Sequence, residues 1–134
     1  MVDPGQTVVC RWLAAGDAGD WDAFDDLLHP DVVIHAPAGL STTSAEAEKG
    51  VWNDALAAMP DLRHEVHEVV VDGEVEMARV VVTGTLTSSF GGVAGTGRSF
   101  RIDQAVITHL RDAKVIEAWE IADVAALKAQ VAAP

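Results

Sequence analysis

The last third of the chain contains the pattern that most constrains its fold. Residues 98 to 110 and 114 to 121 each alternate between polar and apolar side chains, with Arg111-Asp112-Ala113-Lys114 between them. Alternation with a period of two is typical of β-strands, because successive side chains of a strand point to opposite faces. Two such segments around a short polar turn predict a hairpin. A hairpin is hardly stable alone, so we expect it to belong to a larger sheet that packs on a core.

The more apolar face of each strand is expected to lie against that core. In the last strand this face carries Ile116, Ala118 and Glu120, whereas Glu117 and Trp119 point away. Two earlier strands, over residues 75 to 87 and 98 to 110, follow the same pattern. Their inward side chains are Ala78, Val80, Val82, Gly84 and Leu86, and then Phe100, Ile102, Gln104, Val106, Thr108 and Leu110.

The first half of the chain has helical periodicity instead. Apolar residues recur at helical spacing over residues 4 to 16, after which Gly16 and Gly19 break the pattern, and again from Asp20, a potential N-cap, to Leu28. Thr43 and Glu46 have the spacing of a capping box, in which two side chains satisfy the first free amides of a helix. That helix is predicted to continue to about Met59.

The remaining segments complete an α+β domain. A short strand is expected over Val32 to Ala36, and another over residues 62 to 71 before the turn Asp72-Gly73-Glu74. Asp123 is expected to cap a closing helix over residues 124 to 132. Helices followed by a strand meander predict one domain, residues 1 to 134, with its helices on one side of an antiparallel sheet.

Composition narrows the possible partners. The formal net charge is −12, from 9 Lys and Arg against 21 Asp and Glu, which argues against binding to nucleic acid or an anionic membrane. A small apolar or weakly polar organic ligand suits this charge better. The single cysteine, Cys10, excludes an intrachain disulfide and a cysteine-rich metal site. His64 and His67 point to opposite faces of a strand, so we expect no metal, and no cofactor is expected either.

No secretory signal is visible at the N-terminus, because no basic segment precedes an apolar run. A cytoplasmic protein is the expectation.

Small side chains at Ala78, Gly84 and Ala118 predict an open space between the sheet and the helices. Glu120, Gln104 and Thr108 are the polar groups of the faces that surround it. Burial raises the pKa of a carboxyl above about 4.3, and a carboxyl tuned toward neutrality suits acid/base chemistry. We therefore expect Glu120 and Gln104 to be the catalytic pair. The alternatives are a solvated Glu120 at the strand end and a Gln104 at the mouth of the barrel.

Motifs along nearly the whole chain resemble the SnoaL-like polyketide cyclase family. They are Gly19-Asp20-Trp21-Asp22, His29-Pro30-Asp31-Val32-Val33 with Pro37, Met59-Pro60-Asp61-Leu62, Thr83-Gly84-Thr85, Phe90, Thr96-Gly97-Arg98, and Lys114 to Glu120 with Asp123. The resemblance implies a cone-shaped α+β barrel of the nuclear-transport-factor-2-like superfamily. In that fold a curved antiparallel sheet wraps a ligand pocket, and homodimers commonly form through the outer sheet face.

The resemblance also implies a reaction and a pocket. SnoaL-type cyclases close a carbon ring by an intramolecular aldol step, with an acidic residue of the last strand as acid/base, and this position falls on Glu120. The substrate-binding wall that follows from the resemblance and the strand faces comprises Trp12, His35, Trp52, Leu56, Val80, Val82, Leu86, Val106, Thr108 and Ala118. Core packing is the alternative for the two tryptophans, and a place at the rim is the alternative for His35.

This chain departs from the family at three pocket positions. Val106, Leu86 and Ala118 occur where many relatives carry histidine. A cyclase or isomerase acting on a polyketide- or terpenoid-like carbonyl compound is the main hypothesis. A non-catalytic binding protein that templates a flexible substrate by proximity is the alternative.

Two further surface features follow from the strand faces. Arg101 and Asp103 have the Arg-x-Asp spacing of limonene-epoxide hydrolases, but they lie on the outward face, which disfavours that reaction. Ile107, Trp119 and Ile121 form an outward apolar patch. Such a patch usually marks an interface, and we expect it to join two copies of the chain.

Overall fold

The computed structural model describes residues 3–132 and contains one curved sheet of five strands. Four of them, β2 (Arg63–Asp72), β3 (Val75–Leu86), β4 (Arg98–Arg111) and β5 (Lys114–Ala122), form the expected antiparallel meander. The first strand, β1 (Leu28–His35), pairs with β5 in parallel, so the sheet is mixed and has the order β1-β5-β4-β3-β2.

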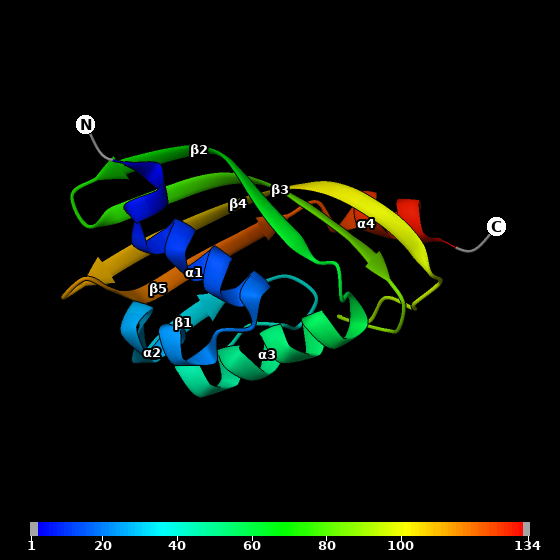
Figure 1. Ribbon diagram of the computed structural model, residues 1–134, viewed down its shortest axis with the longest axis horizontal. Helices are drawn as coiled ribbons and strands as arrows, with labels where there is room; N and C mark the ends of the chain where they lie inside the picture. Colours follow the sequence, from blue (N-terminus) through cyan, green and yellow to red (C-terminus); the bar gives the residue numbers. More distant parts are fainter. Residues whose placement is uncertain (1–2, 133–134) are drawn as a thin grey trace.

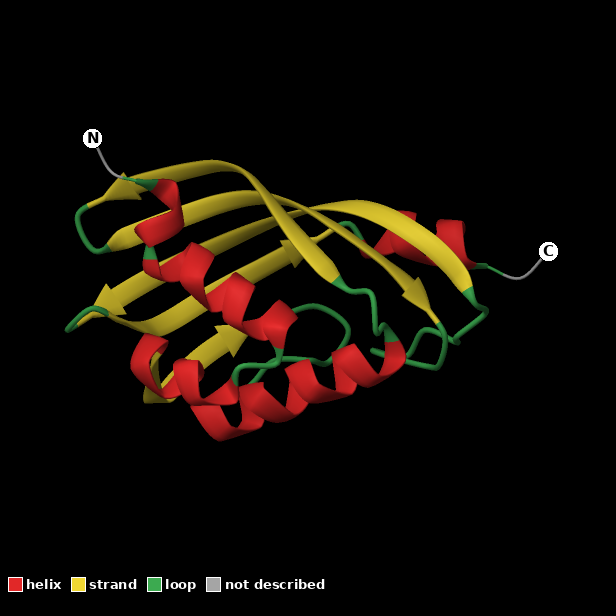
Figure 2. Cartoon of the chain, in the orientation of Figure 1, coloured by secondary structure: helices red, strands yellow, loops and turns green. Residues whose placement is uncertain are grey.

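The helices lie where an α+β fold requires them. A 3-10 turn, η1 (Pro4–Gln6), precedes α1 (Val8–Ala18), α2 (Trp21–Leu27) and α3 (Ala45–Ala58), which cover the concave side of the sheet (Figure 1 and Figure 2). The last helix, α4 (Val124–Val131), packs on β4, and its N-cap is Asp123, as predicted, whose carboxylate accepts from the Ala126 amide. Among the described residues, no helix combines the length and the apolar character that crossing a membrane requires.

The first strand is longer than the sequence pattern predicts. It begins at Leu28 instead of Val32, directly after α2, because Leu28 already pairs with Val115 of β5. Pro30 lies inside it. The sequence pattern left residues 29–31 between the second helix and this strand, but they belong to the strand, since β1 is an edge strand and an edge tolerates a residue without an amide hydrogen.

The first helix continues past the first of the two glycines at which a break was predicted. It passes through Gly16 and ends at the second, Gly19, whose φ of 68° is in the left-handed region that favours glycine. Gly16 is explained by packing, because a Cβ atom built there would lie 2.5 Å from the Trp52 ring of α3. The N-cap of α3 is Ser44 instead of the predicted Thr43, and it accepts from the Ala47 amide at 3.1 Å.

A β-bulge decides which side chains of β5 face the helices. His109 pairs with Glu117 but Leu110 pairs with Val115, so Ile116 has no partner across the strands. The prediction that Ile116 points into the core was wrong, because the extra residue shifts the register and Val115 fills that position with no exposure. Beyond the bulge the predicted faces hold, and Glu120 lies opposite Val106.

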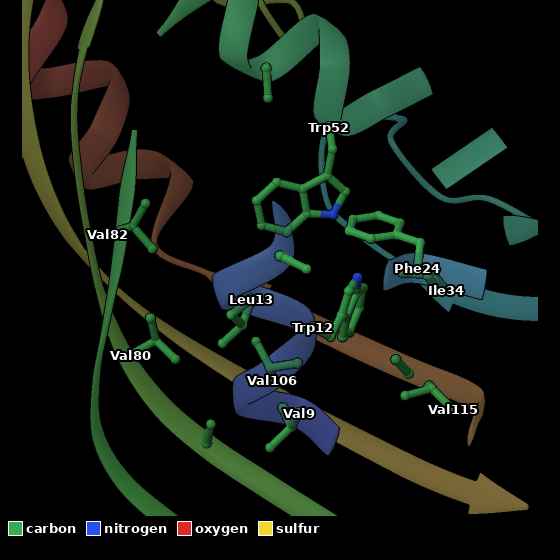
Figure 3. Packing of buried hydrophobic residues seen from close by; sticks show 14 of the residues in the cluster. Val9, Trp12, Leu13, Phe24, Ile34, Trp52, Val80, Val82, Val106 and Val115 are labelled. Carbon is green, nitrogen blue, oxygen red and sulfur yellow. The ribbon is translucent and has the colours of Figure 1, made fainter. Parts of the chain in front are cut away.

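Side chains from α1 and α3 fill the middle of the concave face. Trp12 and Phe24 are fully buried, and Trp52 reaches down from α3 beside them (Figure 3). The Phe24 and Trp52 rings meet edge to face with 6.2 Å between their centroids. Trp52 is therefore fixed by both α1 and α2, and this helix face carries a side chain of the candidate site.

Replacing Gly16 with alanine is expected to destabilise the protein through this contact. The new methyl group would occupy the volume of the Trp52 ring, and overpacking of this kind costs about 1–3 kcal/mol. Urea denaturation measures the change in the free energy of unfolding.

Gly50→Ala is the matched control, because Gly50 lies inside α3 and a Cβ atom there meets nothing within 4 Å. That variant is expected to gain about 0.5–1 kcal/mol from helix propensity. Equal effects at the two glycines would contradict the packing role of Gly16.

Candidate active site

A cavity of the fold lies between α3, the ends of β3 to β5 and α4. It has a volume of about 150 Å³, and its wall is almost entirely apolar. A protein cavity of about 150 Å³ is large enough to hold one benzene ring. The polar side chains in the wall are those of Glu48, His64, Gln104 and Glu120.

Glu120 reaches this cavity from β5. Its pairing opposite Val106 turns its side chain to the concave face, as the alternation predicts. Burial of the carboxyl and, to a smaller extent, the nearby charge of Glu48 raise the pKa of Glu120 to about 8. Its carboxyl group is therefore mostly protonated at pH 7.

A second carboxyl, that of Glu48 on α3, lies in the same wall and is only 2% exposed. Its two oxygens accept hydrogen bonds from the Thr42 hydroxyl at 3.0 Å and from the Trp52 indole at 3.1 Å. Burial raises the pKa of Glu48 to about 7, although both hydrogen bonds act in the opposite direction. Trp52 therefore orients Glu48, and Gly16 in turn leaves room for Trp52.

The two glutamates titrate as one interacting pair. Each carboxylate disfavours ionisation of the other, and within the described residues no lysine or arginine lines the cavity to offset their charge. The pair therefore keeps a proton at neutral pH. It can donate that proton to a ligand oxygen and later recover it.

Glu48 was not among the site residues that the sequence pattern indicates. A signal for it exists, because it precedes Val51 by three residues and Trp52 by four, which places it on the buried stripe of α3. A glutamate within such a stripe is rarely buried without a function.

His64 on β2 adds an imidazole to the wall. Its Nδ1 atom lies 2.7 Å from one oxygen of Asp17, and its backbone amide donates to the other oxygen, also at 2.7 Å. Its ring packs on Trp52 with 5.0 Å between the centroids. The bond to Asp17, at the C-terminal end of α1, gives this histidine one defined orientation.

Gln104 on β4 is the remaining polar group of the wall. Its Oε1 atom is buried and has no hydrogen-bond partner among the described residues. A buried acceptor without a partner costs free energy, about 1–3 kcal/mol. A ligand with a hydroxyl or amine hydrogen would satisfy it.

Five of the residues that the sequence predicts for the site meet in this cavity. They are Trp52, Val82, Leu86, Gln104 and Glu120.

The other predicted residues lie away from the cavity. Trp12, Val80, Val106 and Ala118 are fully or almost fully buried in the core, because side chains of α1 fill the middle of the concave face where an open space was expected (Figure 3). Thr108 is buried there too, and its hydroxyl donates to the backbone oxygen of Glu76. Leu56 is partly buried on α3 outside the cavity wall.

His35 lies on the opposite face of the sheet from Glu120. Its Nε2 atom is 2.7 Å from a carboxylate oxygen of Glu117, and its ring stacks on Trp119 at 5.3 Å. Within residues 3–132, no group of three or more His, Cys, Asp or Glu side chains is arranged to hold a metal ion.

Known proteins resemble this chain over almost its full length. A family model described as SnoaL-like polyketide cyclase matches residues 6–131. No curated protein matches the chain.

Solved structures share the fold. IdmH, a proposed polyketide cyclase from Streptomyces antibioticus, is 29% identical with a TM-score of 0.81, over 94% of this chain and 96% of that one. A proposed SnoaL-like polyketide cyclase from Jannaschia sp. is 22% identical with a TM-score of 0.85, over 95% and 90% of the two chains. A protein of ketosteroid isomerase-like fold from Catenulispora acidiphila, in complex with trimethylamine, is 18% identical with a TM-score of 0.82, over 96% and 95%. The nuclear-transport-factor-2-like fold predicted from the sequence is thereby confirmed.

The raised pKa of Glu120 predicts how stability depends on pH. The folded state retains the proton up to about pH 8, whereas the unfolded chain releases it near 4.5, so the free energy of unfolding falls as pH rises between these values. Glu120→Gln removes this loss. The melting temperature of the variant relative to wild type is expected to rise between pH 5 and pH 8 by about 3–8 °C, which corresponds to about 1–2 kcal/mol.

Glu74→Gln, in the exposed turn between β2 and β3, is the control and should show no such trend. A constant difference between the Glu120→Gln variant and wild type across this pH range would show that the Glu120 carboxyl titrates normally.

Proposed function

Because this chain belongs to the SnoaL-like polyketide cyclase family, we propose that it is an enzyme that cyclises or isomerises a polyketide- or terpenoid-like carbonyl compound by acid/base catalysis. The observation that carries the proposal is the carboxyl pair of Glu48 and Glu120 in an apolar cavity. A protonated carboxyl in such a place donates a strong hydrogen bond to a carbonyl oxygen. It also transfers its proton when negative charge develops on that oxygen.

Glu120 is the proposed proton donor, and Glu48 is its positioning partner. Glu48 is held in place by its hydrogen bonds with Thr42 and Trp52. Its proposed role is to raise the pKa of Glu120 through its charge, and not to contact the ligand itself. Gln104 is proposed to accept a hydrogen bond from a hydroxyl of the substrate through its unpaired Oε1 atom. These three groups would fix a small carbonyl compound in one orientation.

The cavity size limits what the site would enclose. About 150 Å³ accommodates a single ring, so only the reacting end of a larger substrate would be enclosed. The proposed ligand is accordingly a small organic molecule, or a longer one that enters with one ring. The net charge of −12 favours a ligand without negative charge.

A non-catalytic template is the second candidate. It is favoured by the apolar side chains of Val106, Leu86 and Ala118, which are buried and leave no histidine at these positions. A template accelerates ring closure by orientation alone, so its rate would not depend on the protonation of Glu120.

The proposed mechanism predicts a large effect of Glu120→Gln on turnover. Loss of a general acid typically lowers kcat/KM by about 10²–10⁴-fold, and this is expected on any carbonyl substrate that wild type cyclises or isomerises. Glu117→Gln is the matched control, since Glu117 lies on the same strand but on the outer face.

The rate of wild type should also fall as pH rises past about 8, and Glu48→Gln should move this fall to lower pH. A pH-independent rate that survives Glu120→Gln would support the template instead.

We further propose that the outer face of the sheet joins two copies of the chain. Strand register places Met77, Ile107 and Trp119 side by side across β3, β4 and β5, and His35 of β1 continues the row. Ile121, 59% exposed, lies in the next row. An apolar row across a sheet is self-complementary when a second copy packs on it with two-fold symmetry.

Light scattering after size exclusion tests this proposal. Wild type is expected at twice the 14.1 kDa of one chain, and Trp119→Glu is expected at 14.1 kDa, because it places a charge in the centre of the row. A wild-type mass of one chain would exclude the dimer.

A further inference from the structure

His64 brings a basic nitrogen to the cavity that holds Glu48 and Glu120. It lies near the start of β2 with its side chain 8% exposed, and it lines the cavity wall. The second histidine of β2 is His67. Its side chain is 31% exposed and does not line the cavity. The two histidines of this strand therefore have different environments.

Asp17 defines the chemistry of the His64 ring. A carboxylate only accepts hydrogen bonds, so the Nδ1 atom of His64 is the protonated nitrogen in the 2.7 Å contact. Nε2 is then the nitrogen with a free lone pair, and it makes no hydrogen bond to any residue between 3 and 132. A histidine held in this tautomer by a carboxylate is prepared to accept a proton from a ligand.

The position of Asp17 is costly for the helix that carries it. It lies in the last turn of α1, where the helix dipole disfavours a negative charge. Its second oxygen accepts from the His64 backbone amide, so both oxygens serve the same residue. Helix stability does not explain this aspartate, whereas orientation of His64 does.

Trp52 connects the histidine to the carboxyl pair. One face of its ring packs near the His64 ring with an interplanar angle of 49°, and its indole nitrogen donates to Glu48. The same side chain thus contacts His64 and orients Glu48, the partner of Glu120, beside one cavity. General bases and general acids that act on one small substrate need this proximity.

We propose that His64, positioned by Asp17, is the general base of the site. This inference rests on the acid/base function proposed above and adds a catalytic residue to it. The step applies to a carbonyl substrate with a C–H bond beside the carbonyl. Nε2 removes the proton, the electron pair of the C–H bond becomes the carbon–carbon double bond of the enol, and the carbonyl oxygen takes the proton of Glu120. The products are a neutral enol, a His64 imidazolium beside Asp17 and a Glu120 carboxylate.

The enol carbon is the nucleophile that ring closure requires. When it attacks a second carbonyl of the same chain, the new carbon–carbon bond uses the enol electron pair, and the enol proton returns to the Glu120 carboxylate. The oxygen of the second carbonyl takes the proton from the imidazolium, which restores His64. Glu120 and His64 thus both return to their starting states.

Hydrogen–deuterium exchange of a simple ketone tests the first step without the natural substrate. The probe is cyclopentanone, a one-ring ketone of a size that suits the cavity, dissolved in D₂O with the full chain and followed by proton NMR. Wild type is expected to accelerate exchange of the α-protons above the buffer rate. His64→Gln should lower this acceleration by about 100-fold or more, the usual effect of losing a general base.

His67→Gln is the matched control on the same strand and should exchange at the wild-type rate. Asp17→Asn keeps an acceptor for the backbone amide of His64 but presents an amide group to Nδ1, so it should lower the exchange rate about 10-fold or more, as misorientation of a catalytic base does. Long-range ¹⁵N NMR of the His64 ring should show hydrogen on Nδ1 in wild type and its loss from Nδ1 in this variant. If the hydrogen bonds between Asp17 and His64 only stabilise the fold, Asp17→Asn would lower the melting temperature but leave the exchange rate of the folded protein unchanged.

The outcomes separate this inference from the proposed function. Exchange that is lost in Glu120→Gln but unchanged in His64→Gln would overturn the role of His64 and keep Glu120 as the acid. Exchange lost in His64→Gln but unchanged in Glu120→Gln would keep His64 and overturn the proposed acid. Exchange of wild type at the buffer rate would overturn both.

Discussion

The burial of two carboxyl groups in one apolar cavity is the constraint on which the rest of the site depends. Burial in apolar surroundings is the largest effect on the pKa values of Glu48 and Glu120, and the pair retains a proton at neutral pH. The surrounding packing maintains this arrangement. Trp52 binds Glu48 and contacts His64, and Trp52 fits only because Gly16 has no side chain.

Strand register connects this local chemistry to the whole fold. The bulge at Ile116 changes the face of the residues before it, yet Ala118 and Glu120 after it keep the concave face. The core between α1 and the sheet then closes the middle of that face and confines the cavity to one end, under α3 and α4. The space inside the barrel is thus limited to a cavity that can hold one ring of a ligand.

The sequence predicted the features that depend on local periodicity. Alternation placed Glu120 and Gln104 on the concave face, and the α+β class and the meander followed from the same patterns. Glu48 could have been predicted only from its position as a charged residue within the apolar stripe of a helix. The contact between Asp17 and His64 joins residues 47 positions apart, so no local pattern predicts it. The extent of the cavity was unpredictable as well, because it depends on how deeply Trp12 and its neighbours pack against Val80 and Val106.

The protonation state of the glutamate pair is the central claim, and ¹³C NMR of side-chain carboxyl groups measures it most directly. Protein with ¹³C-labelled glutamate carboxyl groups, titrated from pH 3 to pH 10, should give two resonances that change between about pH 7 and pH 8. Glu48→Gln and Glu120→Gln assign these two signals by removing one each. If every glutamate resonance instead titrates near pH 4.5, the carboxyl groups are solvated and the account of the site is wrong.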